Sequence, residues 1–466
     1  MAILKGNKLV LGIVVAVIVL GLVLGGITLT RPPAEPEDIA AKPVAEDPAE
    51  EPAEEEEAAA AAVTLHFVGW EASPLETESV RKGLDAFMTQ NPNITVEYTP
   101  VPHAEYETKL ITSMAGGAGA DVFFVGAEMY RSLQLKGQLL DITEYFEAEF
   151  ELDYFIPSAV SIMLINDRIY GVSGSTVSPI LFYNRDIFDK AGLPYPPKNP
   201  DEAWTWDEFV EIAKQLTIVE AGETTQFGVF GLENPAWPYM KIAMFLSNEG
   251  NVFNEDFTRT TLNTPEVKEV LQSVFDLREK YGVSPEALLL EQLGMSPSHM
   301  LQTGRVAMLI DGSWALQQLA QMDFPVGIGV LPKFDSAVTH GQAHLHSAWI
   351  DTPNPYEAWK LISFLSSEEY QLDLIHSGLW MPNRTALYTE EGIARWFNPD
   401  VHPEGFMDVV PFIRDAIAYP PAFNVRPAAM DIIAEELGAF FDGGKPLNET
   451  LADIEIRVNE ELAREQ

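Results

Sequence analysis

Residues 63–68 (VTLHFV) alternate apolar and polar side chains, as a strand with one buried face does. The apolar residues that follow recur at helical spacing until Asn91-Pro92 stops the helix; they are Val80, Leu84, Phe87 and Met88. A second strand (94–98), a second helix (106–114) and a short apolar strand (122–125) come next. Strands that alternate with helices in this way predict an α/β fold with a parallel sheet and helices on both faces.

The length of the chain predicts more than one compact body. A chain of 466 residues with 47% hydrophobic content exceeds what one hydrophobic core usually serves, so we expect two lobes. Further elements are a helix behind the capping box of residues 205–208, a buried strand over 306–310, and a final helical pair over 432–441 and 451–462.

Charge and cysteine content exclude several classes of function. The net charge of −41 repels nucleic acid and anionic lipid headgroups. The absence of cysteine excludes disulfides, thiolate metal sites, a cysteine nucleophile and a thioether-linked lipid.

The N-terminal segment, residues 1–30, predicts a membrane anchor. Lys5 and Lys8 precede an uncharged run from Leu9 to Leu29, which is long enough to span a bilayer and lacks a cleavage signature at its end. The basic residues before the run place the folded part outside the cell membrane, extracellular or periplasmic. A cleaved signal peptide is the alternative.

Residues 31–62 form a linker of Pro, Ala and Glu. Its eleven acids and two bases repel one another and offer nothing to a core, so we expect a disordered spacer.

Short segments over most of residues 63–466 resemble a known family when their order and spacing are taken together. They are Gly69-Trp70, NPNITVE (91–97), GGAGADVFF (116–124), IYGV (169–172), LFYNRDIF (181–188), AGLP (191–194), TWDEF (205–209), TGRVAM (303–308), GSW (312–314), EAWK (357–360) and FLSS (364–367). This pattern is similar to the sugar-binding, maltose-binding-protein-like group of extracellular solute-binding proteins. The lipid-anchor cysteine common in that family is absent, and Ile27 stands near its place.

The resemblance implies a two-lobed periplasmic-binding-protein-like fold of type II. Carried onto this chain, lobe 1 comprises 63–175 and 350–395, and lobe 2 comprises 176–349 and 396–466. The crossings between them then fall near 176–178 and 347–349. The implied function is that of a monomeric subunit of an ABC transporter, which captures a sugar or oligosaccharide between the lobes and delivers it to a membrane permease without chemistry or cofactor.

Aromatic and acidic side chains near strand ends are the first ligand-binding candidates. Trp70 and Glu71 follow the first strand and Glu128 follows the third, which places them where α/β sheets bind ligands. By resemblance, Glu128 matches a carboxylate that accepts sugar hydroxyls, Trp314 matches a tryptophan that stacks on sugar, and Trp237 lies in a segment that reaches the cleft. The alternative for each tryptophan is a place in the core.

Four further candidates have a plain structural alternative. Thr176 and Ser178 lie at the first crossing, but short hydroxyl residues in loops usually bond the local backbone. Asp311 could accept ligand hydroxyls or cap the helix at Trp314. Arg384 could hold an anionic group of the ligand or form a surface salt bridge.

Two motifs carry no function in this interpretation. His340, His344 and His346 lie close together, but no acid is placed to complete a metal site, so we predict no metal. The glycines of 116–119 lie between a helix and a strand, the reverse of the order in a phosphate-binding loop.

Two rival functions stay open from the sequence. A membrane-bound sensor would keep the same binding fold. A glycoside hydrolase would need two carboxylates at a set separation, which sequence does not give.

Overall fold

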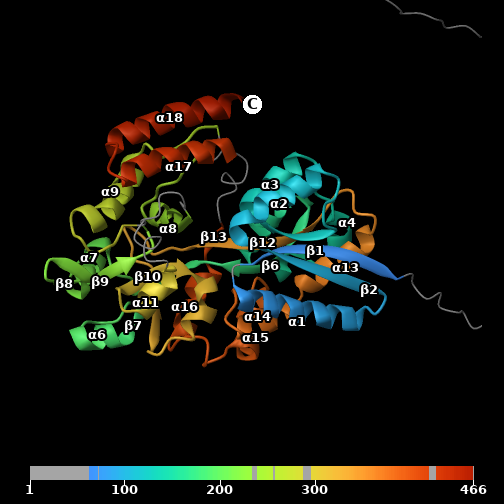
Figure 1. Ribbon diagram of the computed structural model, residues 1–466, viewed down its shortest axis with the longest axis horizontal. Helices are drawn as coiled ribbons and strands as arrows, with labels where there is room; N and C mark the ends of the chain where they lie inside the picture. Colours follow the sequence, from blue (N-terminus) through green and yellow to red (C-terminus); the bar gives the residue numbers. More distant parts are fainter. Residues whose placement is uncertain are drawn as a thin grey trace, which may run out of the picture. The chain divides into compact units, whose positions relative to one another are not determined.

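The computed structural model describes residues 62–71, 73–232, 239–254, 258–286, 295–418 and 427–464 (Figure 1). The predicted membrane anchor (1–30) and nearly all of the predicted linker (31–62) lie outside these residues. Among the helices that the structure describes, none is both long and apolar enough to cross a membrane.

Two sheets organise the described part of the chain. The first has the order β13-β12-β3-β1-β2, with β6 also paired to β12; its strands are β1 (Val63–Glu71), β2 (Ile94–Pro102), β3 (Val122–Gly126), β6 (Gly171–Val177), β12 (His340–Ala348) and β13 (Ile417–Ala418). The second has the order β11-β7-β10-β9-β8; its strands are β7 (Pro179–Asn184), β8 (Ile218–Glu220), β9 (Glu223–Phe230), β10 (Val306–Gly312) and β11 (Val326–Gly329). A hairpin pairs β4 (Leu164–Ile165) with β5 (Arg168–Ile169).

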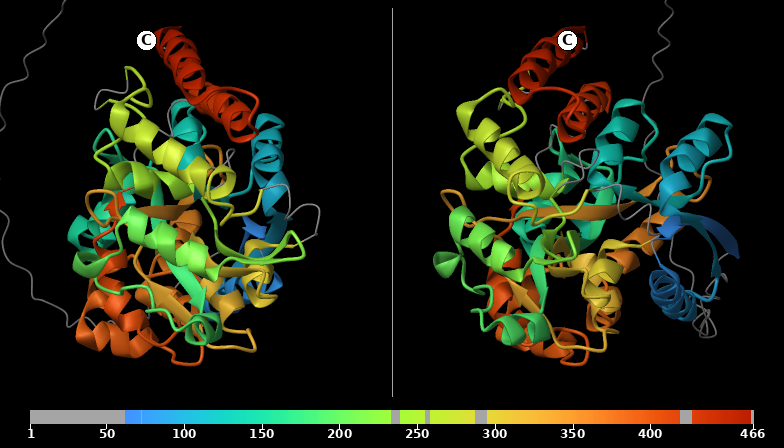
Figure 2. Two further views of the ribbon diagram at one scale, coloured as in Figure 1. Left: turned by 90° about the vertical axis from the view of Figure 1, so that its left-hand side faces the viewer. Right: turned by 60° about the vertical axis from the view of Figure 1, so that its left-hand side comes forward.

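Most of the chain between the strands is helical. The helices are α1 (Pro74–Gln90), α2 (His103–Ala115), α3 (Ala127–Leu135), α4 (Thr143–Glu149), α5 (Pro157–Met163), α6 (Arg185–Ala191), α7 (Trp206–Leu216), α8 (Tyr239–Ser247), α9 (Pro265–Glu279), α11 (Pro297–Gln302), α12 (Leu316–Leu319), α13 (Pro355–Leu365), α14 (Glu368–His376), α15 (Glu390–Trp396), α16 (Phe406–Arg414), α17 (Pro427–Phe441) and α18 (Leu447–Arg464). Figures 1 and 2 show α1 on one face of the first sheet and α2 and α3 on the other.

Alternating burial fixes the register of the first sheet. β1 is parallel to both β2 and β3, and its inward residues Leu65 and Phe67 are fully buried. β3 is buried along its apolar run because helices cover both faces, as the continuous run of residues 122–125 predicts. The predicted parallel arrangement of the first three strands is therefore confirmed.

The chain passes from the first sheet to the second at Ser178, between β6 and β7. It returns before His340, because β12 pairs with β3 and β6 in the first sheet. Residues 340–348, which the predicted division assigns to lobe 2 with a crossing near 347–349, therefore form a strand of the first sheet. The sequence HGQAHLHSA lacks the apolar alternation of a strand, and only its neighbours in the fold bury it.

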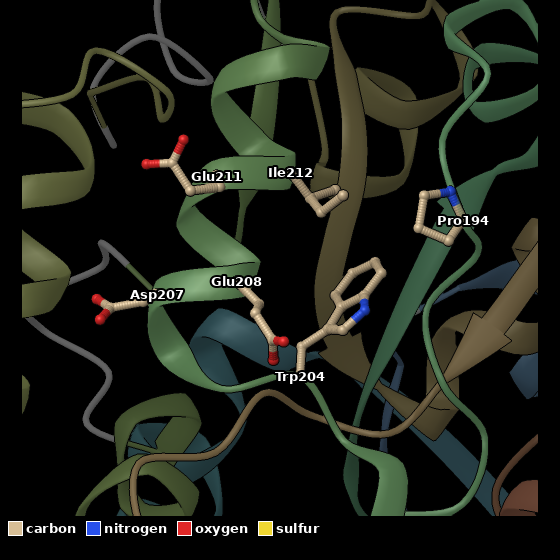
Figure 3. Close-up of a pocket in the computed structure, with 6 residues that line it drawn as sticks. All are labelled: Pro194, Trp204, Asp207, Glu208, Glu211 and Ile212. Carbon is tan, nitrogen blue, oxygen red and sulfur yellow. The ribbon is translucent and has the colours of Figure 1, made fainter.

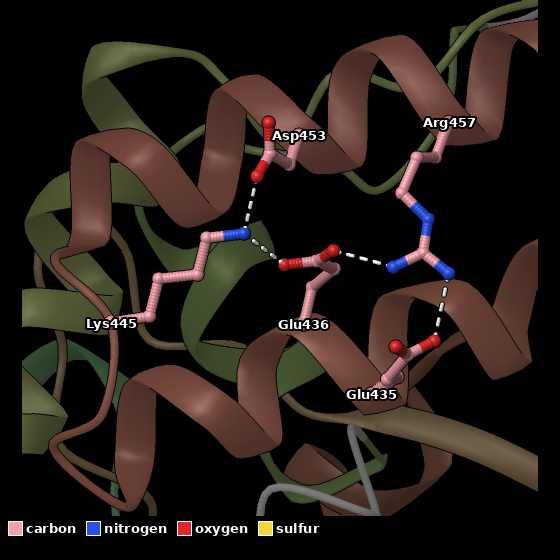
Figure 4. Close-up of polar contacts among 5 residues, drawn as sticks. All are labelled: Glu435, Glu436, Lys445, Asp453 and Arg457. Atoms are coloured by element: carbon pink, nitrogen blue, oxygen red, sulfur yellow. Dashed lines mark hydrogen bonds and ion pairs between the residues drawn. The ribbon is translucent and has the colours of Figure 1, made fainter.

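The two C-terminal helices are joined by charged side chains (Figure 4). The buried carboxylate of Glu436 on α17 accepts from Lys445 and from Arg457 on α18. Lys445 also pairs with Asp453, and Arg457 pairs with Glu435 at 2.8 Å. The predicted final helical pair is thus present and is cross-linked by ion pairs.

Candidate ligand-binding site

Trp70 lies one residue before the end of β1 and is half-buried. The centroid of its ring is 5.1 Å from that of Phe124, 5.5 Å from that of Tyr106 and 5.6 Å from that of His344. Aromatic rings at these separations attract one another at edge-to-face or tilted angles. Trp70 is therefore supported on several sides while part of its surface remains accessible.

Glu71 ends β1 beside Trp70 and is also half-buried. Its carboxylate accepts a hydrogen bond from the hydroxyl of Thr77 in α1. A carboxylate has about four acceptor positions, so this contact leaves room for ligand hydroxyls.

The two hydroxyl candidates at the crossing differ from each other. Thr176 donates its hydroxyl to the carbonyl of Gln342, and its backbone pairs in both directions with Met381 at 2.9 Å. Thr176 therefore bonds the protein backbone, which is the structural alternative to ligand binding. The hydroxyl of Ser178 is buried and meets no hydrogen-bond partner within the described part of the chain.

Asp311 and Trp314 lie together where β10 ends. Asp311 is 8% exposed, and its carboxylate accepts from the backbone N–H of Gly312 at 2.8 Å and from the Trp314 side chain. Burial raises the pKa of Asp311 to about 7, although these two hydrogen bonds oppose the rise. The residue before the short helix is Gly312, with no side-chain cap, so Asp311 is not the helix cap.

The half-buried indole of Trp314 lies over Gly312. A methyl group on Gly312 would fall 2.1 Å from the indole carbon Cζ3, far inside van der Waals contact. The absence of a side chain at this position is what lets the ring lie there.

Arg384 is engaged elsewhere. It is 5% exposed, donates from Nε to the carbonyl of Ser366 at 2.8 Å, and lies 4.0 Å from the ring centroid of Phe155. These contacts favour a structural role for Arg384 in place of a surface salt bridge, because its Nε and Nη2 both donate to the Ser366 carbonyl and its guanidinium packs on two phenylalanine rings.

Two candidates are beyond a structural account. Glu128 is the second residue of α3, but its side chain lies outside the described part of the structure, as does all of Trp237.

The four residues Ser175–Ser178, which we call the crossing segment, connect the two groups of candidates. The hydroxyl of Ser175 shares a hydrogen bond of 2.9 Å with Nδ1 of His344, whose ring contacts Trp70. The carbonyl of Ser178 accepts from the backbone N–H of Ser313, the neighbour of Trp314, at 3.0 Å. The crossing segment thus contacts the surroundings of both candidate tryptophans: it bonds His344 beside Trp70 and Ser313 next to Trp314.

Sequence reasoning missed His344, Ser175 and Trp380 as parts of this arrangement. Nothing in the sequence placed the strand of His344 beside Trp70, since the pairing of β12 with β3 and β6 is long-range.

The described residues include no group of three or more acids or histidines that could hold a metal ion. Two cavities lie away from the candidates. One, of about 390 Å³, is lined by Pro194, Trp204, Asp207, Glu208, Glu211 and Ile212 (Figure 3). The other, of about 290 Å³, is lined mainly by α4 and the β4–β5 hairpin.

The fold is that of a two-lobed α/β binding protein, and two solved structures share it. The ABC substrate-binding protein of Listeria monocytogenes, in complex with cycloalternan, has a TM-score of 0.75 and 24% identity, over 86% of this chain and 99% of that one. A maltose-bound protein of T. maritima has a TM-score of 0.72 and 23% identity, over 87% and 100%.

The family itself follows from the sequence match. Residues 73–372 match the family of bacterial extracellular solute-binding proteins, and the chain belongs to it. A binding protein of Brucella abortus is 25% identical over 309 residues, which cover 66% of this chain and 72% of that protein. The sn-glycerol-3-phosphate-binding periplasmic protein of Rhizobium meliloti is 25% identical, over 61% and 66%. The predicted class, a solute-binding protein rather than an enzyme, is confirmed.

Proposed function

We propose that this chain is the solute-capturing subunit of an ABC importer, with a neutral sugar or oligosaccharide as its ligand. The observation that carries the proposal is the pair of half-buried indoles, Trp70 and Trp314, attached to the crossing segment. A pyranose presents an apolar C–H face that packs on an aromatic ring, while its hydroxyls need nearby acceptors and donors. Glu71, Asp311 and the hydroxyl of Ser178 supply them.

The charge of these candidates favours a neutral ligand over an anionic one. The Rhizobium relative is named for a phosphate ester, an anion that binds most strongly where a cationic side chain faces it. Arg384, the cationic candidate, is occupied by Ser366 and two phenylalanine rings. The charged side chains that accompany the indoles, Glu71 and Asp311, are acidic.

A thermal-shift screen tests the ligand class. Maltotriose, cycloalternan and sn-glycerol 3-phosphate would each be added to the purified extracellular part. A ligand at 100 times its dissociation constant stabilises the folded state by about 2.7 kcal/mol, which is a clear rise in melting temperature. We expect neutral oligosaccharides to raise it; a response to the phosphate ester alone would contradict the proposal.

We further propose a type II topology, a monomer, and a single N-terminal span from Leu9 to Leu29 that holds the folded part outside the cell. The order β2-β1-β3-β12, with β12 antiparallel, supports the topology. Fractionation of cells that express the native protein tests the anchor: we expect the full-length mass in the membrane fraction. A soluble product that begins near residue 30 would contradict it.

A further inference from the structure

His344 is a buried imidazole with a defined hydrogen bond on one side and aromatic rings on others. It is 6% exposed, and its Nδ1 lies 2.9 Å from the hydroxyl of Ser175. Its ring centroid lies 5.6 Å from that of Trp70 at 77°, an edge-to-face contact. On another side the ring of Trp380 approaches to 4.2 Å.

The backbone around His344 is shaped to hold this ring. β6 bulges opposite it: His344 pairs with Ser175 and Leu345 with Ser173, so Gly174 is the extra residue. A side chain on Gly174 would collide mainly with His346, because its Cβ would lie 2.2 Å from Cε1 of His346, and it would come within 3.0 Å of Nε2 of His344. The glycine thus leaves room for both imidazoles, and the bulge leaves Ser175 paired with His344, whose Nδ1 its hydroxyl meets.

Trp380 is held against His344 at a conformational cost. Its φ of 66° lies in the left-handed region, which bulky residues avoid. The next residue, Met381, fixes it by pairing its backbone with Thr176 in both directions at 2.9 Å.

We propose that His344 is a positioning residue, which holds the indole of Trp70 in one orientation so that its accessible surface is preformed for the ligand. The proposal rests on the proposed function of Trp70. His344 acts through Trp70. Ser175 fixes the imidazole from one side and Trp380 supports it from another. Its edge-to-face contact then adds to the contacts of the neighbouring aromatic rings in fixing the orientation of the indole. A preformed platform binds more tightly because ordering it costs nothing at the moment of binding.

The first test needs no ligand. The nine tryptophans would be labelled as 5-fluorotryptophan, and the Trp70 resonance assigned by its loss in Trp70→Phe. In His344→Ala and in Ser175→Ala we expect the single sharp Trp70 signal to broaden or divide. Ser175→Ala retains the imidazole, so its effect reports the orientation of the His344 ring rather than its loss. This variant also replaces His344→Ala in the test if His344→Ala folds poorly.

His346→Ala is the matched control. His346 is fully buried on the same strand and contacts the rings of His344 at 5.2 Å and Phe124 at 5.1 Å, but the ring contacts described for it do not include Trp70. We expect this variant to lose stability and to keep a sharp Trp70 signal. A sharp, single Trp70 signal in both His344→Ala and Ser175→Ala would overturn the proposal.

The second test is a double-variant cycle measured by titration with maltotriose. We expect His344→Ala to weaken binding by about 3- to 10-fold in the parent protein and to have no further effect in Trp70→Ala. Equal losses in both backgrounds would overturn the action through Trp70. If Trp70→Ala itself left affinity unchanged, the proposed site would fail instead, and the fluorine spectra would still decide whether His344 orients the indole.

Discussion

At the scale of single residues, Trp314 decides whether the second group of candidates binds ligand. If its indole lies against a sugar, Trp314→Ala removes a stacking contact of about 0.5–1.5 kcal/mol and roughly 1.5–3 kcal/mol of apolar burial. Together these losses should raise the dissociation constant about 30- to 1500-fold, measured by titration calorimetry beside thermal melting.

Trp204 is the matched control, because it is also half-buried but lines the separate cavity of Figure 3. Trp204→Ala should leave affinity unchanged. A large loss of stability in Trp314→Ala with intact affinity would instead place Trp314 in the core alone.

Gly312 offers a gentler test of the same ring. Gly312→Ala keeps every side chain but drives a methyl group into the indole, so Trp314 must move. We expect ligand affinity to fall by about tenfold. Gly438→Ala is the control, because a methyl group there meets nothing within 4 Å and the residue lies inside α17, where alanine is favourable. Equal affinity in the two variants would argue against a role for the ring.

At the scale of elements, the ion pairs of Figure 4 predict an uneven response to mutation. Glu436 is 7% exposed and accepts from two cations, so Glu436→Ala leaves Lys445 and Arg457 without that partner. We expect a loss of about 1–3 kcal/mol in the free energy of unfolding, measured by urea denaturation. Glu435→Ala removes an exposed partner of the same Arg457 and should cost far less.

Helices and strands with a strong local sequence pattern could be predicted. Those that depend on pairing with distant parts of the chain could not. The capping box of Thr205 and Glu208 is present with both of its hydrogen bonds, and α1 ends before Asn91 as expected. β12 was missed because its histidines and serine are polar and give no apolar pattern in the sequence. Only pairing with β3 and β6 buries them. The same limit hid His344 from the candidate site, whereas Trp70 and Trp314 could be placed because each follows a recognisable strand.

At the scale of the whole molecule, buried histidines predict a loss of stability in acid. Burial lowers the pKa of His340 and His344 to about 3, that of His402 to about 4, and that of His346 well below its usual range. In the unfolded chain each titrates near 6.5, so below that pH the unfolded state binds more protons and the free energy of unfolding falls.

Asp311 opposes this effect with one proton, since its raised pKa favours the folded state as the pH falls from about 7 toward 4. Four histidines against one carboxyl give a net loss of about 4 kcal/mol per pH unit near pH 5, at about 1.4 kcal/mol for each proton. Urea denaturation at about pH 7, 6 and 5 measures the free energy of unfolding. His340→Gln should make its dependence on pH shallower. A constant free energy of unfolding over this range would refute the prediction.

The late position of β12 in the sequence affects folding during synthesis, because the chain is made from its N-terminus onward. β3 and β6 are made early, but the strand that pairs with both arrives much later; Ser175 and its partner His344 are 169 residues apart. All strands of the second sheet lie between these two residues in the sequence. That sheet can therefore form first, while β3 and β6 still lack the strand that pairs with them. Pairings over such distances form slowly, and open edges invite contact with other chains. Amide protection during refolding should therefore appear in β7 and β10 before β12, and a nascent chain that has not yet reached His340 is at its most vulnerable to aggregation.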